Sequence, residues 1–336
     1  MSADQAFSKI VMDEMTRIAD ELRLLEEGAG FLPLAGGGLV RVTGPGHRDV
    51  LQRVVSQDLL PLAPGGGCLA LLLAPKGQFR ALMAVFAGEE DTVLLAPAGR
   101  AAELAGALQK YLALSRCGAH PVPVSDSGTA VVGARWAETA AALGASAPAL
   151  ATGGWQRGTL GGASVSWFGR TLLGVPGAVV VGAGEEARRE LREAGARSLS
   201  REAVELVRVR RGDPAWGAEL TESVLPPEAG IDGETVSYSK GCYIGQETMA
   251  RLKTYGHPTR ALIGVRQLGG EPALPGMPSP LSEPGDDRTR GALTSWAWHP
   301  ELGGVGIALV RREVAAPGKR LSGAGREFET TSFPLW

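Results

Sequence analysis

A single cysteine lies inside a short segment whose residue types could support thiol chemistry. The segment 239–247 reads Ser-Lys-Gly-Cys-Tyr-Ile-Gly-Gln-Glu. Residues 246–253 contain good helix formers and no proline, so Cys242 is expected just before a first helical turn, where unpaired backbone N–H groups point outward. A positive helix end and the nearby ammonium of Lys240 both favour the thiolate over the thiol. The segment therefore predicts a reactive or metal-binding sulfur.

Two glycines flank this cysteine and set its backbone. Gly241 and Gly245 allow a close backbone approach or a positive φ. The alternative for Cys242 is a small buried hydrophobe, which is where most free cysteines are found. If the thiolate is functional, it could attack an electrophile, ligate a transferred metal or form a mixed disulfide, and the sequence does not choose among these.

The remaining cysteines and histidines do not form a metal-binding pattern. Cys68 lies in an apolar run and is expected to be inert, and Cys117 follows Arg116 without other supporting residues. No CxxC pair is present, and the four histidines are dispersed without an HxH or HExxH motif, at His47, His120, His257 and His299. We therefore expect no metal site built by this chain alone.

The composition is that of an ordinary globular protein. Apolar residues make up 44% of the 336 residues, and Lys+Arg 34 against Asp+Glu 36 gives a net charge of −2. This near-neutral balance predicts no direct nucleic-acid contact. No apolar run reaches the length of a membrane span, and the N-terminal 20 residues carry acids rather than a signal sequence, so a cytoplasmic location without a membrane partner is expected.

Strands and helices that could position the thiol alternate along the chain. Apolar patterns predict an α+β fold that ends, after a proline-rich stretch at 272–287, in a small β-barrel. Helices are expected at 5–27, 47–55, 101–111, 137–143, 185–194, 201–212 and 246–253. Strands are expected at 39–42, 68–74, 79–86, 92–96, from Val122 onward, and at 130–132, 164–168 and 178–181. No GxGxxG follows a strand, which argues against a dinucleotide-binding fold.

The cysteine segment resembles the signature of the YgfZ-type folate-binding proteins, relatives of the glycine-cleavage T-protein (aminomethyltransferase). The resemblance runs from about residue 31 to the C-terminus through short motifs in the family's order. These are 42–45 (Val-Thr-Gly-Pro), 56–58 (Ser-Gln-Asp), 75–77 (Pro-Lys-Gly), 110–112 (Lys-Tyr-Leu), 225–230, 240–251 and the terminal 291–311. It implies three domains around a central tetrahydrofolate site. The expected limits are 1–126 and 127–270, with these first two parts interwoven, and 271–336 for the barrel.

The resemblance also carries site residues over to this chain. It implies that Cys242 and Lys240 take part in the chemistry and that Gly241 and Gly245 are signature glycines. The residues implied to hold tetrahydrofolate, or a folate derivative, are Gln57, Asp58, Arg208, Tyr243, Gln246, Glu247 and Arg251. The alternatives weighed against a folate role are a helix-end turn for Gln57 and Asp58, a favourable first-turn acid for Glu247 and packing for Tyr243.

Two positions depart from the family pattern. Arg80-Ala81 stands where the T-protein has an Asp-Asp pair, one carboxylate of which sits by the reacting nitrogen of folate, and neither Arg nor Ala can accept a proton there. Arg210 stands where the family commonly has a glutamate suited to the N–H groups of a pterin. Aminomethyl transfer by the family mechanism is therefore expected to be lost or very weak.

Three hypotheses follow. The first is a tetrahydrofolate-binding protein that assists iron–sulfur cluster assembly or repair, with iron–sulfur proteins or assembly factors as partners, and so supports iron–sulfur enzymes including those of tRNA modification. The second is a folate-dependent aminomethyltransferase-like one-carbon transferase. The third is a non-catalytic scaffold whose folate pocket has decayed, for which Arg210 is the main support.

Overall fold

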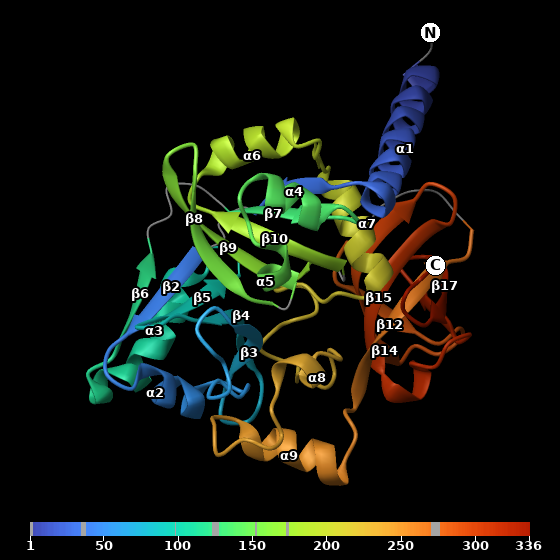
Figure 1. Ribbon diagram of the computed structural model, residues 1–336. Helices are drawn as coiled ribbons and strands as arrows, with labels where there is room; N and C mark the ends of the chain where they lie inside the picture. The colour runs from blue at the N-terminus through green and yellow to red at the C-terminus, as the bar shows by residue number, and fades with distance from the viewer. Residues whose placement is uncertain are drawn as a thin grey trace. The chain divides into compact units, whose positions relative to one another are not determined.

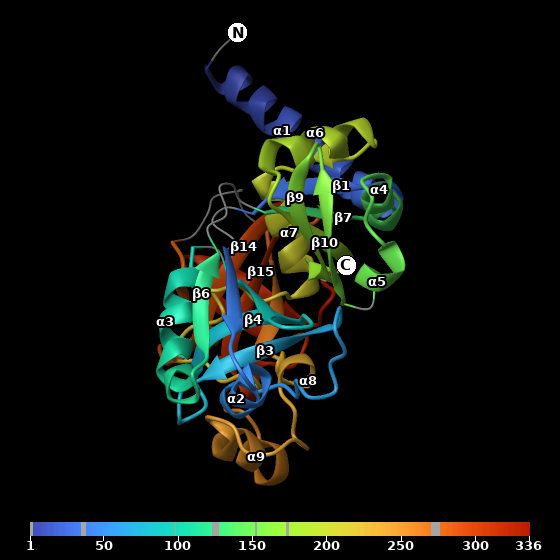
Figure 2. The same ribbon diagram turned by 60° about the vertical axis from the view of Figure 1, so that its left-hand side comes forward.

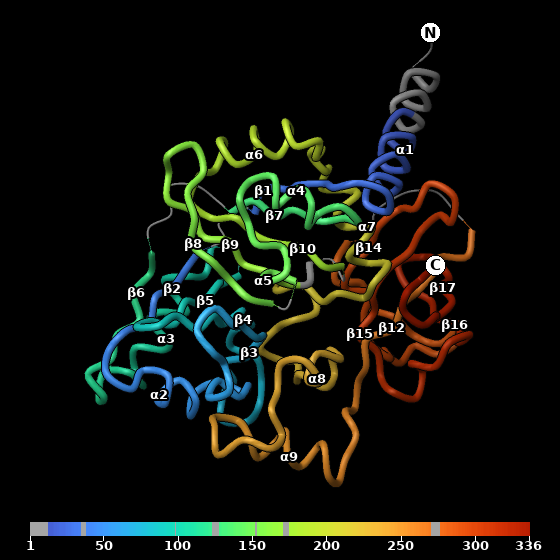
Figure 3. Tube along the Cα trace, viewed as in Figure 1, coloured from blue at the N-terminus to red at the C-terminus, as the bar shows by residue number. Residues whose placement is uncertain are grey.

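The computed structural model describes residues 3–34, 38–97, 99–122, 128–151, 153–172, 175–269 and 276–336 (Figure 1; Figure 3 gives the same view as a Cα trace). The chain forms two compact units. The sheet unit comprises Ala29–Ser198 and Thr221–His257. The barrel unit comprises the N-terminal segment up to Gly28, Leu199–Leu220 and Pro258–Trp336.

A five-stranded antiparallel sheet forms one part of the sheet unit. Its strand order is β3-β4-β5-β2-β6. The strands are β2 (Gly38–Thr43), β3 (Gly67–Leu73), β4 (Phe79–Ala87), β5 (Thr92–Ala96) and β6 (Gly118–Val122). Helices α2 (His47–Val54) and α3 (Ala101–Leu112), followed by η1 (Ala113–Ser115), bury Leu51, Leu104 and Leu108 in the same core as Leu72 and Met83 of this sheet. The apolar spacing of each helix fixes which side it buries.

A six-stranded sheet forms the other part of the sheet unit, in the order β11-β1-β7-β10-β9-β8. The strands are β1 (Gly30–Pro33), β7 (Thr129–Val132), β8 (Trp155–Leu160), β9 (Ala163–Leu172), β10 (Val175–Val181) and β11 (Arg197–Ser198), with helices α4 (Trp136–Ala142), α5 (Ala147–Ala151) and α6 (Gly184–Glu193). Phe86 of the first sheet and Phe168 of the second lie with ring centroids 4.7 Å apart in a shared core. Figure 2 shows the two sheets from the side of β6.

The barrel unit closes six strands into a barrel, in the order β12-β15-β14-β13-β16-β17. The strands are β12 (Arg260–Gln267), β13 (Ser279–Ser282), β14 (Thr289–His299), β15 (Gly303–Arg311), β16 (Arg320–Gly323) and β17 (Arg326–Thr331), with η2 (Arg312–Val314). Trp296 and Phe328 meet edge to face in its core. Helices α1 (Ala3–Glu27) and α7 (Arg201–Arg211) bury Ile18 and Leu206 against β15. The predicted α+β fold with a C-terminal β-barrel is confirmed.

The segment Thr221–His257 returns the chain to the sheet unit and carries the cysteine motif. It contains two helices, α8 (Asp232–Thr235) and α9 (Gln246–Tyr255). The predicted start of a helix at residue 246 is confirmed, and the helix runs to Tyr255 rather than 253. Among the described helices, none combines the length and apolarity that a bilayer-crossing helix requires.

Some sequence expectations differ from the structure. The strand expected from Val122 onward instead ends there, and residues 123–127 lie outside the described part of the chain. β8 was not predicted because its polar and glycine residues obscure the alternation of a strand. β13 lies inside the stretch predicted as a loop, and pairing with β14 stabilises it despite its proline. The domain limits at 126 and 270 stay a prediction; the barrel's own first strand begins at Arg260.

Candidate functional site

The cysteine motif forms a loop, the signature loop (residues 239–246), in which the thiol is exposed while Lys240 and Tyr243 are buried. Cys242 is exposed, whereas Lys240 is 8% and Tyr243 7% accessible. The side-chain oxygen of Gln246, the first residue of α9, accepts a hydrogen bond from Tyr243 N at 3.2 Å. The alternative of Cys242 as a small buried hydrophobe is wrong, because the side chain is exposed. The loop presents its sulfur outward from a fixed backbone.

Lys240 anchors this loop to the segment that follows α2. Its ammonium donates to Val55 O at 2.8 Å and Gln57 O at 2.7 Å, and it lies 5.2 Å from the centroid of the Tyr243 ring. Burial lowers the pKa of Lys240 to about 8, partly opposed by the negative charge of Asp58. These contacts give Lys240 an anchoring role, and a role beside the Cys242 thiol stays a prediction.

The two signature glycines behave differently. Gly245 has φ +83, and a Cβ there would lie 2.7 Å from Ala74 O and 2.9 Å from Leu73 Cβ, so the loop needs glycine to rest on the β3–β4 turn. Gly77, in that turn, is packed in the same way against α9, because a Cβ added to it would lie 2.9 Å from Met249 Cε. Gly241 shows neither a positive φ nor any atom within 4 Å of such an added Cβ. Only Gly245 therefore fulfils the expected backbone role.

Gln57 and Asp58 form the turn that ends α2. The Asp58 carboxylate accepts from Gln52 Nε2 at 2.8 Å and from Leu60 N at 3.2 Å. Gln57 accepts from Asp58 N and donates to Glu234 O at 2.9 Å. These contacts fit the alternative of a helix-end turn. A folate role for Gln57 and Asp58 stays a prediction.

Glu247 and Arg251 project from α9 into solvent, and both are exposed. Glu247 lies in the first turn of the helix, where the positive helix end favours an acid. Tyr243 is buried, and burial raises the pKa of its hydroxyl to about 12, which suits packing rather than proton transfer. The signature loop, α9 and the turn after α2 thus bring most of the predicted site residues into one unit.

Arg208 and Arg210 lie in the barrel unit. The buried guanidinium of Arg208 donates to Asp213 O at 2.6 Å, pairs with Glu219 at 3.1 Å and Glu205 at 2.7 Å, and contacts Ser295. Arg210 donates to Trp336 O at 3.2 Å and lies 5.2 Å from the centroid of the Trp336 ring. Each side chain is thus held by protein groups of its own unit, and a folate contact of Arg208 stays a prediction.

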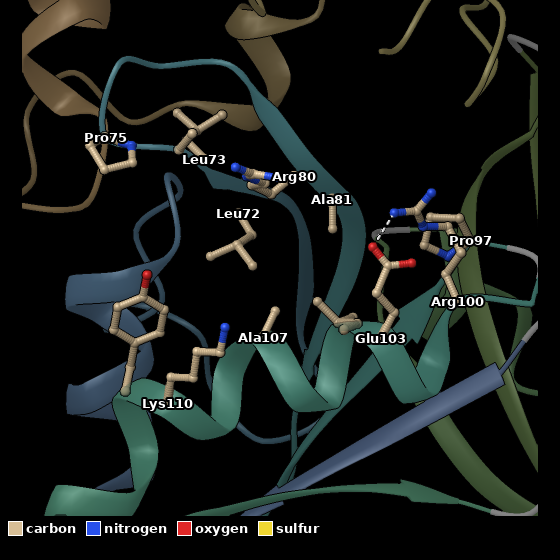
Figure 4. Close-up of a pocket in the computed structure, with 13 residues that line it drawn as sticks. Leu72, Leu73, Pro75, Arg80, Ala81, Pro97, Arg100, Glu103, Ala107 and Lys110 are labelled. Carbon is tan, nitrogen blue, oxygen red and sulfur yellow. Dashed lines mark hydrogen bonds and ion pairs between the residues drawn. The ribbon is translucent and has the colours of Figure 1, made fainter. Parts of the chain in front are cut away.

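A pocket of about 340 Å³, called here the α3 pocket, lies between α3 and the β3–β4 hairpin (Figure 4). Arg80 and Ala81, which the resemblance implies to replace an Asp-Asp pair, both line it. The other lining residues are Leu72, Leu73, Ala74, Pro75, Pro97, Arg100, Glu103, Leu104, Ala107, Lys110 and Tyr111. Arg80 also donates to Glu222 at 2.8 Å, and Arg100 pairs with Glu103. Sequence reasoning noted the Lys110-Tyr111 motif but assigned it no site.

The described residues offer no preformed metal site. Within them, no group of three or more His, Cys, Asp or Glu side chains is placed to hold a metal ion. Cys68 is half buried and Cys117 is buried. A metal centre contacted by Cys242 would need ligands from elsewhere.

Comparison with known proteins places these features in a family. The model of the family described as "GCVT N-terminal domain" matches residues 5–240. The chain is 26% identical over 332 residues to an aminomethyltransferase of Halothermothrix orenii, covering 92% of this chain and 87% of that protein. It is 31% identical over 162 residues to a putative chloroplastic transferase of Arabidopsis thaliana, covering 48% of this chain and about a third (35%) of that protein.

A solved structure shares the fold. The glycine cleavage system aminomethyltransferase T from Bartonella henselae superposes with a TM-score of 0.80 at 19% identity, over 95% of this chain and 89% of that one. The family match contains the α3 pocket and ends at Lys240, so Cys242 lies just beyond it. The chain belongs to the GCVT N-terminal domain family.

Proposed function

We propose that this protein binds a tetrahydrofolate and assists iron–sulfur cluster assembly or repair, with Cys242 as its functional thiol. The observation that carries the proposal is the exposed sulfur on a loop held by the buried Lys240 and by Gly245. Anchoring fixes where the thiol points, and exposure leaves it accessible to a partner. Iron–sulfur enzymes, including those that modify tRNA, would benefit indirectly.

Support for folate comes from the family and from the chemistry of the groups on α9. The exposed carboxylate of Glu247 can accept N–H groups, and the exposed guanidinium of Arg251 can pair with a carboxylate of the glutamate tail. Gln57, Asp58, Arg208, Tyr243 and Gln246 complete the proposed set. Bound tetrahydrofolate would supply nitrogen atoms able to carry a one-carbon unit. The chain's own contribution would be to orient it.

The replaced acid pair argues against the reaction of the T-protein. Arg80 and Ala81 offer no carboxylate at the α3 pocket, and Arg80 is already paired with Glu222. A positive charge there would oppose protonation of a nearby amine. Assistance to iron–sulfur cluster assembly or repair does not require a proton transfer by a carboxylate at this pocket.

The folate claim is tested by titrating the protein with 5-formyltetrahydrofolate. Binding is followed by tryptophan fluorescence and, independently, by the heat released in a calorimeter. We expect saturable binding that weakens in Arg251→Gln. No saturation by either method would remove folate from the proposal.

The thiol claim is tested separately, in a strain lacking the gene. We expect Cys242→Ala to fail to restore iron–sulfur enzyme activity, whereas Cys68→Ala, with its half-buried thiol, restores it. Full restoration by Cys242→Ala would mean that the thiol is not needed.

A second candidate is an aminomethyltransferase-like one-carbon transferase. It is favoured by the resemblance to an aminomethyltransferase over 92% of the chain. Incubation with the aminomethylated H-protein of a glycine cleavage system and tetrahydrofolate distinguishes the two. Enzymatic formation of methylenetetrahydrofolate would favour the transferase and would show that Arg80-Ala81 does not prevent the reaction.

A further inference from the structure

We propose that the α3 pocket binds a small organic monocarboxylate with a flat apolar body. This site is formed by the sheet unit alone, and the proposal does not depend on folate binding or on the thiol. Its chemistry follows from three features: an apolar floor, an excess of cations, and the adjacent Arg80 and Ala81 of β4 in its lining.

The floor of the pocket is apolar. Leu72 from β3, Ala81 from β4, and Leu104 and Ala107 from α3 line it, and Figure 4 shows Leu72 between the strand and the helix. Pro75 and Pro97 extend the apolar lining. A flat hydrocarbon or aromatic body would remove this surface from water, which is the usual source of affinity in small-molecule pockets.

The rim of the pocket is cationic. Three cations, Arg80, Arg100 and Lys110, line it against a single acid, Glu103. Arg80 and Lys110 come from opposite walls, strand β4 and helix α3 (Figure 4). Lys110 has no acidic partner within the residues that the structure describes. A carboxylate between the two walls would meet an ammonium that is not already neutralised.

The competing ion pair at Arg80 is weak. Arg80 is 51% and Glu222 66% accessible, and exposed pairs of this kind contribute little because solvent screens them. Glu222 is not among the residues lining the pocket. An incoming carboxylate can therefore share the Arg80 guanidinium with Glu222, or replace Glu222 as its partner, at a small cost in free energy.

Two adjacent residues of β4 shape this pocket. The small side chain of Ala81 leaves space at the floor, and the guanidinium of Arg80 adds a positive charge at the rim. Both features favour an anion over an amine.

Size and charge narrow the ligand class. A volume of about 340 Å³ lies at the lower end of the range for ligand pockets, which suits a molecule of one or two rings. The required chemistry, an aromatic body with a single carboxylate, occurs in free aromatic acids. A benzoylglutamate carries two carboxylates and serves as the contrasting probe.

The test is calorimetric titration of the full chain with benzoate, 4-aminobenzoate and 4-aminobenzoylglutamate, with neutral benzamide as the uncharged probe. We expect saturable binding of benzoate or 4-aminobenzoate and binding of benzamide that is weaker by about tenfold or more. Tighter binding of the small acids assigns the pocket to a free aromatic acid, and tighter binding of 4-aminobenzoylglutamate, a dicarboxylate, would contradict the proposal.

Charge and volume variants make the assignment specific to this pocket. Lys110→Gln should weaken carboxylate binding roughly fivefold and Glu103→Gln should strengthen it, whereas the exposed Lys319→Gln should change nothing. Ala107→Leu should abolish binding by filling the floor, whereas Ala102→Leu, exposed on the same helix, should not. Absence of saturable binding by every carboxylate, or binding indifferent to Lys110→Gln and Ala107→Leu, would overturn the proposal.

Discussion

The signature loop and the α3 pocket use their cations in opposite ways. In the loop, Lys240 is buried and its ammonium is bound by two backbone carbonyls. In the pocket, Lys110 and Arg80 line an accessible hollow, and Arg80 pairs with the exposed Glu222. The two regions touch, because Leu73 and Ala74 line the pocket and also support Gly245. A positive charge in a motif thus indicates a ligand only where packing leaves it accessible.

The largest expected effect concerns the three thiols. Burial raises the pKa of Cys68 to about 12, with a smaller opposing effect of Lys240, and Cys117 is buried, whereas Cys242 is exposed. Iodoacetamide at a pH of about 8 should label Cys242 at least about tenfold faster than the other two, as followed by peptide mass spectrometry. Equal labelling of Cys68 would mean that the loop is not the more accessible region.

Removing the anchor of the loop should destabilise the protein. Lys240→Met leaves Val55 O and Gln57 O without their donor, and we expect a loss of about 2–3 kcal/mol in the free energy of unfolding. Chemical denaturation measures it. Lys76→Met, at an exposed position, is the matched control and should cost less than about 0.5 kcal/mol. Similar losses in both variants would contradict the anchoring role.

The two signature glycines should respond differently to one added methyl group. Gly245→Ala places a Cβ at 2.7 Å from Ala74 O in a left-handed backbone, and we expect a loss of about 2 kcal/mol. Gly241→Ala meets no atom within 4 Å and should change stability by less than about 0.5 kcal/mol. Thermal and chemical denaturation give both values. If Gly245→Ala is tolerated as well as Gly241→Ala, the loop does not rest on the β3–β4 turn through Gly245.

The smallest expected effect is a pH dependence that Lys240 contributes. Its pKa falls from the ordinary 10.5 to about 8 because burial disfavours the ammonium. Between these two values the unfolded chain binds more protons, so stability should rise with pH across this window and the contribution should be complete above pH 10.5. We expect about 1–2 kcal/mol after allowing for solvent screening. The difference in free energy of unfolding between wild type and Lys240→Met, measured from pH 8 to pH 10.5, isolates the contribution of Lys240. A difference that does not change with pH would contradict this contribution.

Much of the fold was predictable because its signals are local. The apolar run 68–74 predicted β3, and the periodicity of 101–111 predicted α3 to within a residue. The polar composition of β8 obscured a strand that pairing with β9 stabilises. At the site, the motif identified Cys242, but nothing local indicated that Lys240 would reach back to Val55, 185 positions earlier in the chain.

The sequence by itself determined the α+β fold with its terminal barrel and the helix that begins at Gln246. These follow from periodicity, local propensity and residue identity, which need no knowledge of distant contacts. Only the tertiary structure decided that Cys242 is exposed, that the ammonium of Lys240 is bound by backbone carbonyls, and that Arg80, Ala81 and Lys110 share one pocket. The physical reason is that accessibility and charge pairing depend on contacts between residues far apart in the chain.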